Sequence, residues 1–401
     1  MRRILMCVAM VSLVCAQARA YQPTHAVASA PLAAQTKRFE PVDVFVGVAA
    51  DPQSQYPIYR IPAIVRCHDQ HETLLAFAEG RQASGDQSSN DLVLRTSADQ
   101  GATWSPLRVI AEEGEASLNN PCALVLPVPG GPCRVVLMYQ SYPKGVGEYE
   151  AKAVRDEHSV RSWMITSDDA GVTWSKPVDL TEQVIPPEAS TAASGPGCGI
   201  WLEDGPRRGR LIMPLNCRIG KQWTVYAVFS DDDGATWKRG AVAESRTNGW
   251  PNEVQMVELA GGDVMLNCRL QGGKDRCRGV AVSRDGGEHW SPVSRDERLI
   301  DPVCMGALVR LRPADAVSQG VLAFSNPASA SHRRGGVIRL SQDDGRTWPV
   351  SFPVTQVPDA GFAYSVLVPL SDQTLGCLYE SDAPGVPIRF VRLGWDLSGA
   401  K

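Results

Sequence analysis

Short apolar runs of about four to eight residues recur along the chain, and clusters of Gly, Pro, Asn and Asp separate them. Many of the runs are rich in β-branched and aromatic residues, which is typical of strands. No segment keeps a helical period over three turns, apart from short turns expected within 147–156. The pattern therefore predicts an all-β protein. The expected strands are 73–78, 92–96, 133–139, 163–166, 210–214, 224–229, 264–268, 279–283, 321–324, 337–341 and 374–379.

One eight-residue phrase, Ser-x-Asp-x-Gly-x-Thr-Trp, occurs five times, with His289 replacing Thr in the fourth copy. Its Asp can accept hydrogen bonds from its own turn, and its Gly can take a positive φ without a Cβ clash. Each copy therefore predicts a tight turn before a strand. A single copy would fit an ordinary hairpin, whereas five indicate a repeat. The copies, called Asp-boxes here, are Ser97–Trp104, Ser167–Trp174, Ser230–Trp237, Ser283–Trp290 and Ser341–Trp348.

The spacing of the Asp-boxes predicts the architecture. They start 70, 63, 53 and 58 residues apart (167−97, 230−167, 283−230, 341−283), about the length of one four-stranded propeller blade with its loops. Without the first 20 residues, 381 remain (401−20), and six blades would take about 63 each. We therefore expect a six-bladed β-propeller of four-stranded antiparallel blades, with one blade lacking an Asp-box.

The N-terminus has the pattern of a secretory signal. Arg2 and Arg3 precede the apolar run Ile4–Val14, and Ala18-Arg19-Ala20 is a small-residue cleavage pattern. The run is too short for a transmembrane helix, so we expect no membrane span. Residues 1–20 are thus a predicted signal peptide, 21–40 a flexible leader and 41–401 the folded domain. The expected location is periplasmic or secreted.

Charge and cysteine content narrow the function classes. The chain has 40 basic and 44 acidic residues, a balance that gives no support for a nucleic-acid-binding surface. Nine cysteines remain after signal removal (11−2), and no Cys-x-x-Cys or Cys/His cluster suggests a metal, so no cofactor is expected. Cys268 and Cys277 lie symmetrically about Gly272-Gly273. They fit either a cross-strand disulfide or two unpaired buried thiols.

Residues that do not repeat carry the candidate chemistry. Arg60-Ile61-Pro62 precedes the first blade's strands, Arg81 ends the next strand, and Asp86 follows in a polar loop. This segment resembles the bacterial exo-sialidases (neuraminidases). In it, Arg-Ile-Pro is followed by a strand, then by an Arg with an Asp five residues on, and then by an Asp-box. The resemblance implies that Arg60 is one of three arginines that clamp the substrate carboxylate, and that Asp86 is the acid/base. Taken alone, Arg60 could be a surface arginine and Asp86 a solvated loop residue.

The remaining motifs follow the same family order. Asn252-Glu253 and Asn267-Cys268-Arg269 resemble the family's glutamate and second arginine, and His332-Arg333 resembles the segment of the third. Arg334 is adjacent, so that match could shift by one. Tyr364 and Glu380 match the nucleophilic tyrosine and the glutamate that steadies the first arginine. The family segment Ser194-Gly195-Pro196-Gly197 is also present, and the match covers about 44–393.

These roles form a coherent chemistry. Three guanidiniums supply planar, permanently charged donors for a carboxylate on the anomeric carbon. A neutral phenol avoids the repulsion that a carboxylate nucleophile would meet there, and sialidases are an established exception with a Tyr nucleophile. Glu253 would act as the base for Tyr364, because the ordinary tyrosine pKa is about 10. Retention at the anomeric carbon would follow.

The resemblance leaves substrate details open. Asn119-Asn120-Pro121 stands where many bacterial relatives place Asp-Pro near a ring hydroxyl, and Arg81 would contact the same region unless Glu79 holds it. The expected partners are sialylated glycans, glycoproteins or glycolipids, acted on by a monomer. The alternatives are a hydrolase of another 2-keto-3-deoxy sugar acid, a trans-sialidase, or a non-catalytic propeller that binds anionic glycans.

Overall fold

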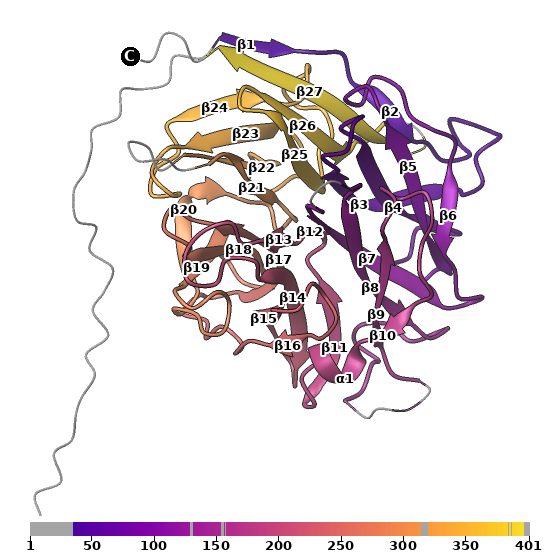
Figure 1. The fold of residues 1–401 in the computed structure, drawn as a ribbon, viewed down its shortest axis with the longest axis vertical. Helices are drawn as coiled ribbons and strands as arrows, with labels where there is room; N and C mark the ends of the chain where they lie inside the picture. The colour runs from indigo at the N-terminus through magenta and orange to yellow at the C-terminus, as the bar shows by residue number, and fades with distance from the viewer. Residues whose placement is uncertain are drawn as a thin grey trace, which may run out of the picture. The chain divides into compact units, whose positions relative to one another are not determined.

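Six antiparallel sheets follow one another along the chain as the blades of a β-propeller, as predicted (Figure 1). The computed structural model describes residues 35–396, apart from 129–130, 154–155, 157, 314–319, 384 and 386. Blade 1 comprises β3 (Ile58–Arg66), β4 (Leu74–Arg81), β5 (Asn90–Ser97) and β6 (Arg108–Ala111). Blade 2 comprises β7 (Ser117–Leu126), β8 (Arg134–Tyr142), β9 (Arg161–Ser167) and β10 (Val178–Asp179), with β12 (Gly197–Cys198) parallel to β7. The described helix α1 (Thr181–Val184) is short.

The next blades repeat this plan. Blade 3 has β11 (Ala189–Ser194), β14 (Leu211–Ile219), β15 (Gln222–Ser230) and β16 (Lys238–Arg239), with β13 (Ile200–Trp201) beside β14. Blade 4 has β17 (Trp250–Glu258), β18 (Val264–Gln271), β19 (Cys277–Ser283) and β20 (Ser294–Ile300). Blade 5 has β21 (Ala307–Arg312), β22 (Val321–Pro327), β23 (Gly336–Ser341) and β24 (Val350–Pro353).

Blade 6 joins the two ends of the described chain. It comprises β25 (Ser365–Ser371), β26 (Thr374–Glu380) and β27 (Ile388–Asp396), and β1 (Gln35–Arg38) and β2 (Val42–Phe45) complete it by pairing with β27. This origin explains why blade 6 has no Asp-box. The boxes connect third to fourth strands, and here the outer strands come from the N-terminal side. The predicted signal peptide and most of the predicted leader lie outside the described residues, while β1 occupies 35–38 of that leader.

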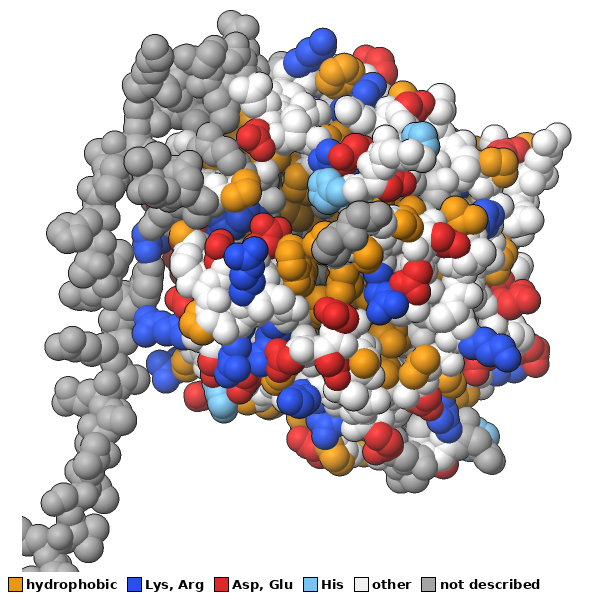
Figure 2. Space-filling model, viewed as in Figure 1, with side chains coloured by type: hydrophobic (Ala, Val, Ile, Leu, Met, Phe, Trp, Pro, Cys, Tyr) orange, Lys and Arg blue, Asp and Glu red, His pale blue; other side chains and the backbone are white. Residues whose placement is uncertain are grey.

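The apolar core lies between blades rather than within them. Six of the hydrophobic clusters each combine side chains of two successive blades, including a cluster of blades 6 and 1 that closes the ring. Alternate side chains of a strand point to opposite faces of its sheet. Because each blade is covered on both faces, its strands read as apolar runs, and β4 is buried along its whole length. On the face drawn in Figure 2, acidic and basic side chains are interspersed. Among the described residues, no helix is long and apolar enough to cross a bilayer.

All five Asp-boxes share one hydrogen-bond pattern. In the first, the Gly101 amide donates to Ser97 Oγ at 2.8 Å, and the Thr103 amide and hydroxyl donate to the Asp99 carboxylate at 2.9 and 2.6 Å. In the fourth box the amide and ring of His289 take over the contacts to Asp285, which explains why the substitution is tolerated. The Trp ring of each Asp-box also packs against side chains of the blade that precedes its own.

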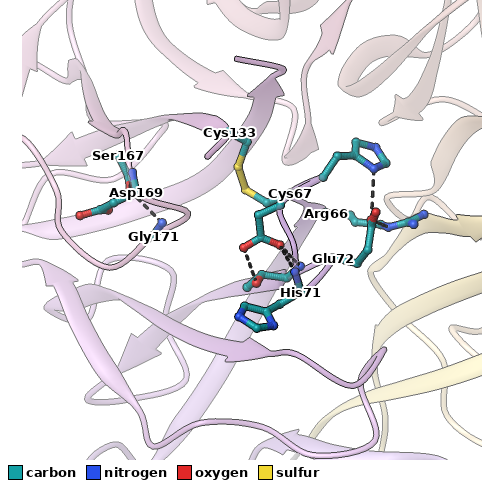
Figure 3. Close-up of a disulfide and its surroundings, with 11 residues drawn as sticks. Arg66, Cys67, His71, Glu72, Cys133, Ser167, Asp169 and Gly171 are labelled. Carbon is teal, nitrogen blue, oxygen red and sulfur yellow. Dashed lines mark hydrogen bonds and ion pairs between the residues drawn. A yellow bond between two sulfur atoms is a disulfide. The ribbon is translucent and has the colours of Figure 1, made fainter. Parts of the chain in front are cut away.

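A disulfide joins Cys67 and Cys133, 66 residues apart, and so ties blade 1 to blade 2 near the second Asp-box (Figure 3). The alternative disulfide between Cys268 and Cys277 is wrong, since both thiols are free and buried. In the register of β18 and β19, Cys268 faces Gly279 rather than Cys277.

Candidate active site

The residues predicted to act chemically lie at the ends of the strands opposite the Asp-boxes. Arg60 pairs with Glu79 in the register of β3 and β4, whereas Ser97, which opens the first Asp-box, pairs with Leu74 at the other end. The same polarity holds in blade 4, where Asn252 pairs with Arg269 and Val264 pairs with the box residue. One end of the propeller therefore carries the repeated turns and the other carries the unrepeated residues.

Arg60 is held by a nearly buried carboxylate. Its Nε and Nη2 donate to the two oxygens of Glu380 at 2.8 and 3.1 Å, and the Ile61 amide donates to the same carboxylate at 2.8 Å. The negative charge of Glu380 raises the pKa of Arg60 above its ordinary value. Arg60 keeps 23% of its side chain exposed, so it can still meet a ligand. The predicted pairing of Glu380 with the first arginine is thus present.

Tyr364, Glu253 and Arg269 form a buried triplet. The Tyr364 hydroxyl donates to Glu253 Oε1, Arg269 Nη1 lies 2.7 Å from Glu253 Oε2, and the same nitrogen donates to the Tyr364 oxygen at 3.1 Å. Burial raises the pKa of Tyr364 well above 10, and Glu253 adds to the rise while the nearby arginines oppose it. Burial alone would lower the pKa of Arg269, but Glu253 and Tyr364 outweigh it and raise the pKa. A sequence interval of 111 residues separates the phenol from its acceptor.

Arg333, rather than Arg334, belongs to this group. Arg333 Cζ lies 5.4 Å from the centroid of the Tyr364 ring, and Arg60 Cζ lies 5.2 Å from the same centroid. Arg334 instead pairs with Asp382 at 2.6 Å. The structure therefore brings Arg60, Arg269 and Arg333 together around one tyrosine.

Arg81 connects a fully buried acidic residue, Glu79, to an exposed one, Asp86. It is 1% exposed, its Nε donates to Glu79 Oε2 at 2.7 Å, and its Nη1 donates to Asp86 Oδ1 at 2.8 Å. Burial raises the pKa of Glu79 to about 6, although Arg81 and the Asn120 amide oppose the shift. Glu79 therefore pairs with Arg81, as the alternative interpretation of Arg81 expected. Asp86 has 62% of its side chain exposed and faces solvent.

The sequence reasoning missed a further acidic side chain, Glu148. It lies in the β8–β9 loop, and burial raises its pKa to about 7, with the charges of Glu253 and Asp86 adding to the rise. The loop also touches the one that carries Asp86, because a Cβ on Gly147 would lie 3.5 Å from Gln87 Oε1. Its only signal in the sequence was its place in the segment expected to form short turns.

The arrangement suits an anionic ligand and nucleophilic chemistry. Three guanidiniums can bind one carboxylate, and a phenol with an adjacent carboxylate base can attack a neighbouring carbon. Within the described ranges, no group of three or more His, Cys, Asp or Glu side chains could hold a metal ion.

Comparisons with known proteins agree with this geometry. A BNR repeat-like domain matches residues 72–377. A sialidase of Micromonospora viridifaciens is 33% identical over an alignment of 388 residues that covers 93% of this chain and 57% of that protein. Human sialidase-3 is 30% identical over 313 residues, covering 72% of this chain and 70% of that protein. The solved structure of Hadza microbial sialidase Hz136 superposes with a TM-score of 0.71 at 30% identity, over 85% of this chain and 66% of that one. The chain thus spans less than two thirds of the Micromonospora relative.

Proposed function

The chain belongs to the sialidase family of BNR-repeat propellers, and we propose that it is a retaining exo-α-sialidase that releases terminal sialic acids from glycoconjugates. The observation that carries the proposal is the contact between the Tyr364 hydroxyl and Glu253 in the middle of three arginines. A protein that only binds anionic glycans would need the arginines but not this phenol–carboxylate couple. The pairing therefore favours catalysis over binding alone.

Substrate binding rests on the arginines. Arg60, Arg269 and Arg333 would donate to the carboxylate attached to the anomeric carbon, and their fixed charge would select an anionic sugar. Glu380 holds the Arg60 side chain in one orientation, so Arg60 does not have to change its rotamer when the ligand binds. Arg60 and Glu380 are thus already paired before the ligand binds.

The first chemical step would form a bond between the Tyr364 oxygen and the anomeric carbon. Glu253 takes the phenol proton, which is necessary because burial disfavours a free phenolate. Asp86 gives a proton to the leaving oxygen as the glycosidic bond breaks. The leaving oxygen competes with Arg81 for this carboxyl group, which lies exposed at the rim.

The second step would restore the enzyme. Asp86, now a carboxylate, takes a proton from water, the water oxygen bonds to the anomeric carbon, and the phenol oxygen leaves and recovers its proton from Glu253. Two displacements at one carbon retain its configuration. Hydrolysis and transfer share the covalent intermediate, and the acceptor decides between them.

We also propose that the protein works outside the cytoplasm on sialylated glycans, glycoproteins or glycolipids. The Cys67–Cys133 disulfide supports export, because structural disulfides persist mainly in oxidising compartments. The N-terminal signal pattern points the same way.

A fluorogenic sialoside assay tests the activity. Wild-type protein should release the fluorophore, and Tyr364→Phe should lose nearly all turnover while keeping its melting temperature. Parallel assays with deaminated and octulosonic analogues address a hydrolase of another 2-keto-3-deoxy sugar acid. Faster turnover of an analogue would transfer the proposal to that substrate, and no release from pH 4 to 8 would refute it.

A further inference from the structure

A fully buried ion pair joins β19 of blade 4 to the segment that follows β20. Arg278 and Asp301 are 0% and 1% exposed, and Arg278 Nη1 lies 3.2 Å from Asp301 Oδ2. Replacing such a pair by apolar residues is often neutral or stabilising, because removing both charges from water costs about as much as their attraction returns. Stability alone is therefore a weak reason for this pair.

The pair fixes the short segment that follows β20. Asp301 Oδ1 accepts the Cys304 amide at 2.9 Å, and Arg278 Nη1 donates to the Cys304 carbonyl at 2.5 Å. Asn326 Nδ2 donates to Asp301 Oδ2 at 3.1 Å and holds the carboxylate from blade 5. Both backbone groups of Cys304 are thus tied to the buried pair.

Between the tied positions, Val303 has a φ of +64°. A β-branched residue rarely takes this strained conformation, which persists only where its surroundings enforce it. The Val303 carbonyl accepts a hydrogen bond from Arg333 Nη2 at 3.1 Å. The backbone carbonyl of this strained residue is therefore the acceptor for the side chain of the third arginine.

The backbone of Arg333 is anchored separately. Its carbonyl accepts the Phe362 amide at 3.0 Å, two residues before Tyr364. Its side chain is exposed, so its backbone anchor alone would leave the guanidinium several rotamers. The contact with Val303 restricts them.

From these contacts we infer that the buried Arg278–Asp301 pair is a positioning device for Arg333, which it orients toward the substrate carboxylate by holding the Val303 carbonyl in place. The inference rests on the proposed function, since it assigns a carboxylate ligand to Arg333. Arg278 and Asp301 do not touch the ligand and act only through this segment.

The test compares binding of an unsaturated sialic acid analogue, 2,3-didehydro-N-acetylneuraminic acid, with binding of its methyl ester. The ester lacks the charge that the arginines bind, so the ratio of the ester's Kd to the acid's Kd reports how strongly the arginines favour the carboxylate. Asp301→Asn should lower the wild-type ratio about tenfold, or about 1.4 kcal/mol. A merely structural role would lower the melting temperature and leave the ratio of the folded protein unchanged.

Asp344→Asn is the matched control. Asp344 pairs with Arg310 at 3.2 Å, and their side chains are 8% and 17% exposed, but the pair belongs to the fifth Asp-box at the opposite end. The same substitution there should leave the ester-to-acid Kd ratio at its wild-type value. An equal fall in both variants would overturn the inference.

Two further variants cover a failure of Asp301→Asn to fold. Val303→Gly removes the conformational strain and loosens the acceptor, and it should lower the ratio with little change in melting temperature. In an Arg333→Ala background, Val303→Gly should have no further effect on the ratio, because its action passes through Arg333. Effects that persist there would overturn the inference.

The two proposals fail differently. Wild-type protein that neither binds the acid nor cleaves a sialoside would refute the proposed function and this inference with it. Wild-type protein that does both, with variants that keep the full acid preference, would refute the inference alone.

Discussion

The Cys67–Cys133 disulfide should be a major source of stability without any role in catalysis. Its loss is best tested with the double variant Cys67→Ala/Cys133→Ala. The bond closes a loop with a sequence separation of 66 residues. Loop-closure entropy for such a loop corresponds to about 4 kcal/mol at 25 °C.

The expected shift in melting temperature follows from the size of the domain. With an unfolding entropy of about 2.1 cal/mol/K per residue over roughly 360 residues, 4 kcal/mol corresponds to about 5 °C. Thermal unfolding followed by circular dichroism measures it, and reductant should lower the melting temperature of wild type toward that of the variant.

The control variant is Cys268→Ala/Cys277→Ala, which removes two thiols that are free in the structure. It should lose little stability and should not respond to reductant. The kcat of the folded Cys67→Ala/Cys133→Ala enzyme should equal that of wild type, because both cysteines flank the Asp-box ends of their strands. A melting temperature unchanged by the double substitution would show that the disulfide does not stabilise the fold. A large fall in kcat would show that it also affects catalysis.

Three further predictions concern the scaffold and the site. Trp174→Ala should cost about 3 kcal/mol, since its ring meets Phe77 edge-on at 5.9 Å between centroids, and a fall in kcat at unchanged melting temperature would contradict this. Glu148 has a pKa raised to about 7, so it gains a negative charge above that pH. The KM for an anionic substrate should then rise above pH 7 in wild type but stay flat in Glu148→Gln, and identical profiles would exclude this effect. Glu380→Gln should raise KM about tenfold by weakening its hold on Arg60, and unchanged kinetics with a lower melting temperature would show a purely structural role.

The architecture was largely predictable from the sequence because it rests on local chemistry. Each Asp-box closes its hydrogen bonds within eight residues, so the phrase that forms the turn can be read directly. The box spacing then predicted six blades, which the structure confirms. The composition of blade 6 was not predictable, because the pairing of β1 and β2 with β27 joins strands from opposite ends of the chain.

Contacts between residues far apart in the chain, such as the disulfide, could not be predicted from the sequence. The disulfide joins loops of successive blades, and no local pattern distinguishes Cys67 and Cys133 from the other cysteines. Symmetry about two glycines pointed instead to Cys268 and Cys277, which the strand register keeps apart. Their placement depends on the register of β18 and β19, which the pattern of residue types does not encode.

The candidate site shows the same division. Motif order identified Arg60 and Tyr364, and the structure brings both together, although the motif could not separate Arg333 from Arg334. Glu148 escaped notice because its loop has no motif and its perturbed pKa arises from burial beside other acids. The support of Arg333 by Val303 depends on one backbone torsion, which residue identity alone does not reveal.

We propose that Tyr364 is the nucleophile and that Glu253 activates it. The most direct measurement is intact-protein mass spectrometry after incubation with 2,3-difluorosialic acid, followed by peptide mapping. We expect one added sialyl group on the wild-type peptide that contains Tyr364, and no added group in Tyr364→Phe. An adduct on a carboxylate, or none in protein that hydrolyses sialosides, would contradict it.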